Sequence, residues 1–393
     1  MQLKGGVVVR KAYLLVLFLS FSLCLAQSAP ESVNAFGIDL YRFLAGSSEN
    51  IFFSPFSLST ALAMTYLGAD GNTALQMRKV LHFEDEGLHE SFSNLIDSLN
   101  KPVEDYKLAI ANALWLQEGY PLLESFLAAV EKYYRAPVNS VDFVNDPKNS
   151  VRRINDWIEQ KTEGKIKDMI NENDVDSLTR LIITNAIYFK GNWVVPFDPQ
   201  ATKKDVFYVS EDKTVEVDMM KLTADFNYFE DEKVQILELP YAGGNLSMIV
   251  VLPKRGVRLS EVEKDLSLEK FQEWLEKLRD RRVEVMLPRF KVMQRFSLKK
   301  TLSEMGMVDA FTNAADFSKM DGTKMLKIQN VIHQAFVEVN EEGTEAAAAT
   351  AVIIGIKMGP SMPVIFRADK PFLFFIYEKK SGVILFMGRL QKP

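Results

Sequence analysis

The sequence has very little cysteine and histidine: one cysteine and three histidines in 393 residues. Cys24 lies near the N-terminus, so the rest of the chain has no disulfide, thiol nucleophile or cysteine-based metal site. His82 and His89 stand in a stretch rich in Asp and Glu, and we predict a solvent-exposed face there rather than a metal site. We expect no bound metal and no cofactor.

Motifs of common enzymes are also missing. The sequence contains no G-x-S-x-G elbow, H-E-x-x-H pair, P-loop or dinucleotide-binding fingerprint. The formal net charge of -5 disfavours nucleic acid and anionic membrane surfaces as partners. The sequence therefore predicts a protein that is not an enzyme and that binds neither nucleic acid nor membrane.

Long hydrophobic runs are limited to the N-terminus. Three basic residues lead into the apolar run 12–25, and small residues follow it. This run is shorter than the roughly 18 apolar residues of a membrane span, and its layout is typical of a secretory signal peptide. We predict that residues 1–26 are removed, together with Cys24, and that residues 27–393 form a secreted, extracellular protein.

What is present is the composition of a globular protein, 47% hydrophobic and 25% charged. Spacings of three and four predict a helix capped by Asn149 and Ser150 that ends near Gly164, and a second helix over 268–278. Strand patterns occupy residues 181–189, 246–252 and 331–339, and a C-terminal hairpin joins 372–377 to 383–387. The fold class is therefore predicted to be α+β.

The segment from Glu341 to Arg367 is the least ordinary part of the chain. It joins the strand that carries His333 to the C-terminal hairpin, and a linker of about 20 residues within one domain usually has a function. Ala346–Ala349 favour a helix, whereas the β-branched run Thr350–Ile356 favours an extended chain. Composition alone leaves both interpretations open.

Several ordered stretches of the chain resemble the serpins, a family of serine protease inhibitors. They are Asn50–Ser57, Gly71–Ala74, Thr184–Trp193, Phe336–Ala346 and Ala368–Phe375. The resemblance implies a helix-rich α+β serpin fold with three β-sheets, formed by one domain over 27–393. It also implies an exposed reactive-centre loop at about 341–366, which inserts into the central sheet after a protease cleaves it and so traps the acyl-enzyme.

The hinge, the first part of this loop, must be able to enter the central sheet as a strand. By this resemblance, the hinge of the present chain consists of Glu341, Glu342, Gly343, Thr344, Glu345, Ala346, Ala347, Ala348, Ala349 and Thr350. An inserted strand buries alternate residues, and the set Thr344, Ala346, Ala348, Thr350, Val352, Ile354, Ile356 contains no charge. Glu345 falls in the other set and would face outward. The hinge pattern therefore matches an inhibitory serpin.

The resemblance implies a reactive bond fourteen positions after the hinge glycine, between Lys357 and Met358. Lys357 is also the only basic residue between Glu345 and Arg367. A lysine at this position fits the acidic specificity pocket of trypsin-like serine proteases. The predicted partner is such a protease, held in a covalent complex by a monomeric inhibitor. The alternative is a non-inhibitory serpin that acts as a carrier, storage protein or chaperone.

Other positions carry over from the family as structural controls of the central sheet. The shutter, which holds the central strands together, corresponds to Ser54, Ser57, Asn185 and His333. The breach, where insertion starts, corresponds to Trp193, Arg289 and Glu341, and we expect an ion pair between the last two.

Two surface features remain. Asn245-Leu246-Ser247 is a glycosylation sequon in a predicted turn, so Asn245 is predicted to carry a glycan. Heparin is not expected as a cofactor, because Asp280 and Glu284 dilute the basic residues Arg279, Arg281, Arg282 and Arg289.

Overall fold

The computed structural model describes residues 28–46, 48–83, 87–100, 106–344 and 362–393, and it confirms the α+β class. Its α-helices are α1 (Ala29–Leu44), α2 (Pro55–Tyr66), α3 (Gly71–Val80), α4 (Leu88–Leu99), α5 (Glu124–Tyr134), α6 (Pro147–Lys161), α7 (Leu259–Asp265), α8 (Leu268–Lys277), α9 (Lys299–Met305) and α10 (Ser318–Asp321). Short 3₁₀ turns are η1 (Glu172–Asp174), η2 (Pro199–Ala201) and η3 (Asp309–Phe311).

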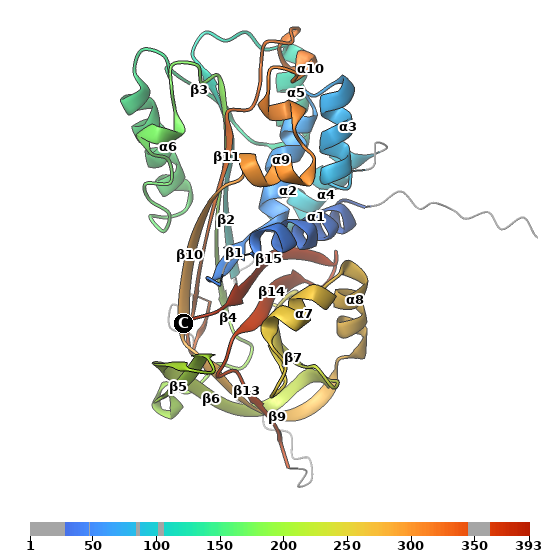
Figure 1. Ribbon diagram of the computed structural model, residues 1–393, viewed down its shortest axis with the longest axis vertical. Coiled ribbons are helices and arrows are strands. Elements are labelled where there is room, and N and C mark those ends of the chain that lie inside the picture. Colours follow the sequence, from blue (N-terminus) through green and yellow to red (C-terminus); the bar gives the residue numbers. More distant parts are fainter. Residues whose placement is uncertain (1–27, 47, 84–86, 101–105, 345–361) are drawn as a thin grey trace, which may run out of the picture.

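The strands fall into two groups in space (Figure 1). The six-stranded central sheet contains β2 (Tyr106–Gln117), β3 (Val138–Val141), β4 (Leu181–Asn192), β10 (Phe290–Ser297), β11 (Asn330–Val339) and β12 (Gly343–Thr344). The nine-stranded sheet contains β1 (Ile51–Phe53), β5 (Lys203–Ser210), β6 (Lys213–Glu230), β7 (Val234–Pro240), β8 (Leu246–Pro253), β9 (Arg279–Pro288), β13 (Val364–Arg367), β14 (Phe372–Glu378) and β15 (Val383–Leu390).

The described strands therefore make two hydrogen-bonded sheets, whereas the resemblance implies three. The long strand β6 is the reason. Its 18 residues pair first with β5, then with β9, and finally with β7. One continuous backbone thus links strands that would otherwise belong to separate sheets, while the fold class is unaffected.

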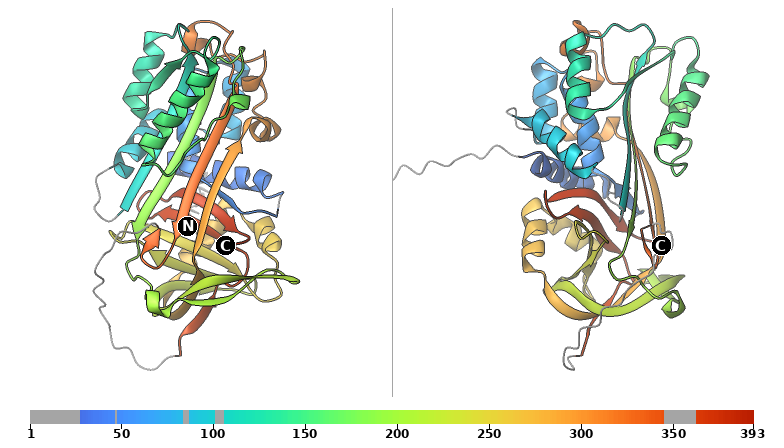
Figure 2. Two further views of the ribbon diagram at one scale, coloured as in Figure 1. Left: turned by 90° about the vertical axis from the view of Figure 1, so that its left-hand side faces the viewer. Right: turned by 180° about the vertical axis from the view of Figure 1, so that it is seen from behind.

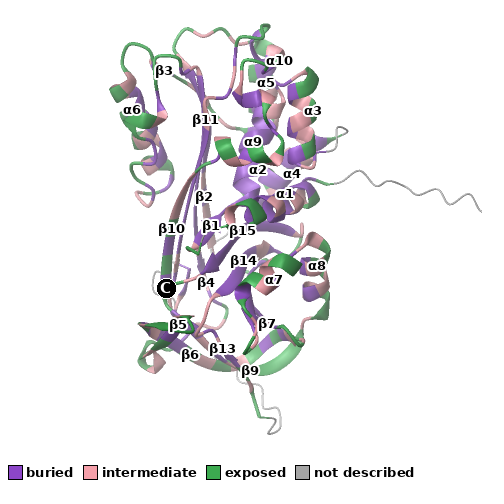
Figure 3. Cartoon of the chain, viewed as in Figure 1, coloured by how far each residue is buried: buried purple, intermediate pink, exposed green. Residues whose placement is uncertain are grey.

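The central sheet is buried on both faces (Figure 3). Odd-numbered residues of β4 and β11, such as Ile187 and Ala335, join the main hydrophobic core. Even-numbered residues, such as Ile182 and Phe336, join a second cluster with α6 and the segment that follows it. Because side chains alternate along a strand, β4 and β11 each contribute to two cores.

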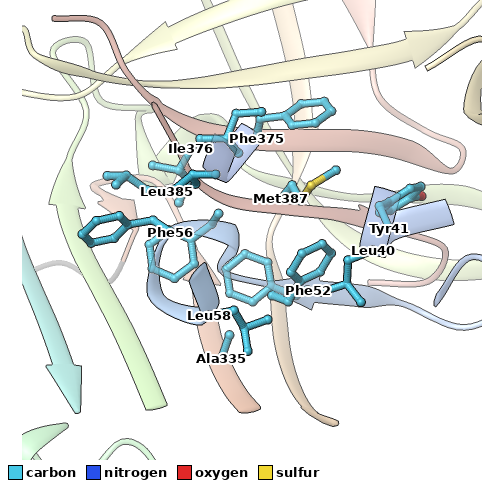
Figure 4. Close-up of a cluster of buried hydrophobic side chains, with 14 of the residues drawn as sticks. Leu40, Tyr41, Phe52, Phe56, Leu58, Ala335, Phe375, Ile376, Leu385 and Met387 are labelled. Carbon is cyan, nitrogen blue, oxygen red and sulfur yellow. The ribbon is translucent and has the colours of Figure 1, made fainter. Parts of the chain in front are cut away.

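The main core beside the central sheet is rich in aromatic rings (Figure 4). Phe52 of β1 stacks on Phe374 at 5.6 Å and on Phe386 at 5.3 Å between ring centroids. Leu58 of α2 and Ala335 of β11 lie in the same fully buried cluster. This packing fixes α2 and the β14–β15 hairpin against one face of the central sheet.

Most elements predicted from sequence patterns are confirmed, namely β4, β8, β11, α8 and the β14–β15 hairpin. The predicted start of α6 is wrong. The helix begins at Pro147, and the N-cap is Asp146, whose side chain accepts a hydrogen bond from the Asn149 backbone N–H. Proline is favoured in the first turn of a helix, which explains the earlier start.

The solvent-exposed face predicted for His82 and His89 is also wrong. His82 Nε2 lies 2.8 Å from Asp39, and His89 Nδ1 lies 2.6 Å from the Tyr134 hydroxyl, with both rings half-buried. Burial lowers the pKa of His89 to about 4, against the opposing charge of Glu90. Within the described ranges as a whole, no group of His, Cys, Asp or Glu side chains could hold a metal ion. No helix of these ranges is long and apolar enough to span a membrane.

Candidate functional site: the hinge and the central sheet

The first residues of the hinge already lie within the central sheet. β12 pairs with β4 through Gly343–Asn192 and Thr344–Gly191, and with β11 through Thr344–Val339, antiparallel on both sides. Beyond this point β4 and β11 pair directly with each other in parallel. The sheet is therefore parted at one end, and β12 occupies the parting.

A tight turn brings the chain from β11 back into the sheet. The Asn340 side chain accepts hydrogen bonds from the backbone N–H groups of Glu342 and Gly343, and the Asn340 N–H donates to the Gly343 carbonyl at 2.9 Å. Gly343 has φ +156°, and a Cβ there would lie 2.0 Å from the Gly191 carbonyl oxygen. Only glycine fits this close approach of two backbones.

At the breach, an ion pair between Arg289 and Glu341 holds this turn in place. Arg289 Nε donates to both carboxylate oxygens of Glu341, at 2.8 and 2.7 Å, and Thr202 donates to the same carboxylate. The Glu341 side chain is 5% exposed, whereas that of Arg289 is 44% exposed. Burial tends to raise the pKa of Glu341, but the hydrogen bonds from Arg289 and Thr202 outweigh it, so the pKa is lowered and the carboxylate stays charged.

The aromatic side of the breach packs directly on the hinge. Trp193 stacks on Tyr241 at 4.5 Å between centroids, and its indole N–H donates to the Asn340 carbonyl at 3.0 Å. The Tyr241 hydroxyl lies 2.7 Å from Thr344 Oγ1, and both residues are fully buried. The side chain of Thr344 therefore already faces the main core. This is the orientation predicted for the alternate residues of the hinge that become buried on insertion.

The shutter residues meet halfway along the sheet. Ser54, the N-cap of α2, donates through its hydroxyl to the Leu385 carbonyl at 2.6 Å and accepts from the Ser57 N–H at 3.0 Å. Asn185 donates to the Ser57 hydroxyl, and its carbonyl groups accept from His333. All four side chains are completely buried, so every polar atom depends on a protein partner.

The network fixes the tautomer of His333. The Ser54 backbone N–H is 3.1 Å from Nε2, so Nε2 must accept, and Nδ1 carries the proton that it donates to Asn185. Burial lowers the pKa of His333 to about 3, so the ring is neutral at physiological pH. The shutter is therefore a neutral hydrogen-bonded network, and His333 is neither a metal ligand nor a charged group.

Three residues of this site, Asn112, Thr202 and Tyr241, are not predicted from the sequence. Asn112 of β2 accepts from the Ser57 hydroxyl at 2.9 Å, and its Nδ2 donates to the Ser57 carbonyl at 3.4 Å. Thr202 and Tyr241 complete the breach. The one available signal for Asn112 was an amide in the middle of an apolar strand, where a buried polar group requires a partner.

The remaining predicted residues of the loop cannot be placed. Glu345, Ala346, Ala347, Ala348, Ala349, Thr350, Lys357 and Met358 lie outside the described residues.

The two surface predictions concern exposed residues. Asn245 is exposed in the turn before β8. Three of the four arginines are already engaged: Arg279 with backbone carbonyls, Arg282 with Asp225, and Arg289 with Glu341.

Comparison with known proteins agrees with this geometry. The serpin (serine protease inhibitor) family model matches residues 31–393. Human serpin B3 is 42% identical, covering 93% of this chain and all of the relative, and the leukocyte elastase inhibitor of Bos taurus is 44% identical, covering 91% and 97%. An uncharacterised serpin-like protein of Thermococcus kodakarensis is 44% identical, covering 92% and 85%.

Solved structures give the same result. Uncleaved ovalbumin superposes with a TM-score of 0.85 at 32% identity, covering 93% of this chain and all of that one. Human thyroxine-binding globulin superposes with a TM-score of 0.85 at 31% identity, covering 93% and 98%. The family match, the relatives and the parted central sheet together establish that this chain is a serpin, a member of a family of serine protease inhibitors rather than of enzymes.

Proposed function

We propose that this serpin is a secreted inhibitor of trypsin-like serine proteases, cleaved at Lys357–Met358. After cleavage, the acyl-enzyme remains attached to the loop while the loop inserts into the central sheet between β4 and β11. The observation that supports the proposal is the position of β12, which lies between β4 and β11 and pairs antiparallel with both.

The register of β12 can be continued along the two flanking strands. Thr344 lies opposite both Gly191 and Val339. Each later residue then has one partner on each side: Ala346 with Phe189 and Val337, Ala348 with Ile187 and Ala335, and Thr350 with Asn185 and His333. The last two partner pairs are also directly paired in β4–β11, so both sides give one consistent register.

The same register predicts which side chains become buried. Partners opposite one another point to the same face, so Ala346, Ala348 and Thr350 join Thr344 on the main-core face. Thr350 would arrive at the shutter, where its hydroxyl can take over hydrogen bonds that now join Asn185 to His333. Small side chains and one hydroxyl therefore match the space and the polarity along this path.

The energies are compatible with trapping. Insertion adds roughly a dozen backbone hydrogen bonds at about 1 kcal/mol net each. A protease domain is stable by only about 5–15 kcal/mol, so insertion can supply enough free energy to distort its active site.

Incubation with trypsin tests the proposal. The wild type should give a complex that survives boiling in SDS, and K357E should lose at least about a hundredfold in association rate because trypsin's specificity pocket carries an acid. The melting temperature of uncleaved K357E should equal that of the wild type. Unchanged trapping by K357E would place the reactive bond elsewhere.

A carrier role is the second candidate, supported by the similarity to thyroxine-binding globulin. The two functions differ in the cleaved molecule. A loop-cut inhibitor should melt far above its uncut form because it gains a strand, whereas a carrier that cannot insert its loop should melt at an unchanged temperature and capture no protease.

Secretion, glycosylation and the monomeric state are parts of the same proposal. The exposed position of Asn245 supports a glycan there. Expression in a secreting eukaryotic cell should yield a monomer in the medium that begins at residue 27. Its gel mobility should shift with an N-glycosidase, and the shift should disappear in N245Q.

A further inference from the structure

The segment that follows α6 packs on one face of the central sheet and is contacted both by α6 and by β10. We call residues 162–175 the strap. We propose that Arg295 is a positioning residue that fastens the strap to β10 and thereby slows loop insertion. The proposal rests on the insertion mechanism proposed above.

The strap is held from the β2 side of the path through α6. Trp157 of α6 packs edge-on against Trp115 of β2 at 5.5 Å between ring centroids. Asn155 of α6 donates to the Ile170 carbonyl at 2.8 Å and accepts from the Ile170 N–H at 2.9 Å. The middle of the strap is therefore bound to α6, which lies over β2 (Figure 2).

The strap is also held from the opposite side of the path, by Arg295. Arg295 of β10 donates from Nε to the Met169 carbonyl and from Nη2 to Asp174, each at 2.5 Å. Asp174 also accepts from the Asn171 N–H at 2.9 Å, and its side chain is only 10% exposed. Two charge-assisted hydrogen bonds therefore hold the strap to β10.

The order of strands puts the insertion path between these two anchors. The sheet runs β10, β11, β4, β2, with the parting between β11 and β4. Arg295 lies opposite Gln334 of β11, and the continued register places Ala349 opposite the same Gln334. The inserting loop therefore reaches the level of Arg295 after about its first six residues.

Insertion must break this attachment or lift the strap. An added strand moves β10 and β11 about 4.8 Å away from β4 and β2. Hydrogen bonds of 2.5 Å cannot follow such a displacement while Asn155 keeps Ile170 on α6. Breaking the Arg295 contacts therefore adds to the activation free energy of insertion. It does so at the step in which residues beyond Ala348 enter the sheet.

The rate of peptide uptake tests this without a protease. A fluorescently labelled synthetic peptide of residues Thr344–Lys357 should anneal into the uncut protein, followed by anisotropy. R295A and D174N should take it up about tenfold faster than the wild type, as expected when a charge-assisted contact leaves the barrier. R295K, which keeps the charge but cannot reach both partners, should be intermediate.

K291A is the matched control. Lys291 lies on the same strand and face, but its partner Glu338 is on β11, which moves together with β10. Its uptake rate should stay within twofold of the wild type. R295A should also lower the melting temperature of the uncut form while leaving unchanged that of the form cleaved in its loop by a protease that is not trapped, because only the uncut form uses the contact.

Two results would overturn the proposal in distinguishable ways. Wild-type uptake with an unchanged rate in both R295A and D174N would mean that the strap does not gate insertion, while the proposed function would stand. Failure of the wild type to take up peptide, to trap trypsin or to gain stability on cleavage would remove the insertion mechanism itself.

Discussion

The breach, at one end of the β4–β11 junction, and the shutter, halfway along it, are held by different kinds of interaction. At the breach, a partly exposed Arg289 pairs with the buried carboxylate of Glu341 beside the hinge. At the shutter, Ser54, Asn185 and His333 form a neutral and fully buried network. A charged contact at the solvent edge can exchange partners with water, whereas a buried neutral network must be replaced group by group. We therefore expect the sheet to open from the breach.

The largest expected effect comes from placing a charge on the buried hinge position. T344R would bury a guanidinium beside Tyr241 without a counter-charge, at a cost of several kcal/mol. The variant should be cut by trypsin without trapping it, so that the number of inhibitor molecules consumed per trypsin rises at least about tenfold. Titration of residual trypsin activity measures this number.

E345R is the control for that variant, because Glu345 belongs to the set that faces outward. It should trap trypsin with nearly the wild-type stoichiometry. Equal behaviour of the two variants would contradict the assigned facing, and with it the idea that the breach end already shows the inserted register.

The shutter should respond to pH. The pKa of His333 is about 3 in the folded chain against an ordinary 6.5, so the unfolded chain binds the proton first as pH falls. The stability that depends on the neutral ring is complete above about pH 6.5 and is lost progressively towards pH 3. At pH 5 the loss amounts to about 2 kcal/mol. Urea unfolding of the wild type and H333Q at pH 8 and pH 5 measures it.

The wild type should lose about 2 kcal/mol more than H333Q between these two pH values. Contributions from His89 and other groups are common to both proteins and cancel. A parallel loss in both proteins would show that His333 does not sit neutral in the shutter.

The smallest expected effect is that of the breach ion pair. E341Q keeps a hydrogen-bonding side chain but removes the charge, and because Arg289 is nearly half exposed, the loss should be only about 1 kcal/mol of unfolding free energy. Raising NaCl to 0.5 M should weaken the wild type but hardly affect the variant. R282Q, which breaks a surface pair with Asp225 far from the hinge, should leave the peptide uptake rate unchanged.

Much of the fold and part of the site can be predicted from the sequence. Alternation of side chains locates β11 and the facing of Thr344, and the C-terminal hairpin follows from its apolar runs. The cap of α6 was misassigned because Asn149, Ser150 and Asp146 are all good capping residues, and only the backbone geometry selects Asp146. His89 was misjudged because neighbouring acids say nothing about the rings of Tyr66 and Tyr134 that cover it.

The hinge pattern and the reactive bond at Lys357–Met358 remain predictions that the resemblance to the serpins implies. The sequence by itself determined the spacings of α8, the alternation along β11 and the C-terminal hairpin. Such properties depend on neighbours a few residues apart, whose relative positions the backbone geometry dictates. Only the tertiary structure decided that Asn112 joins Ser57, that Tyr241 receives Thr344 and that Arg295 holds the strap. These partners lie more than 50 residues apart in the chain, and their contact depends on how whole sheets and helices pack.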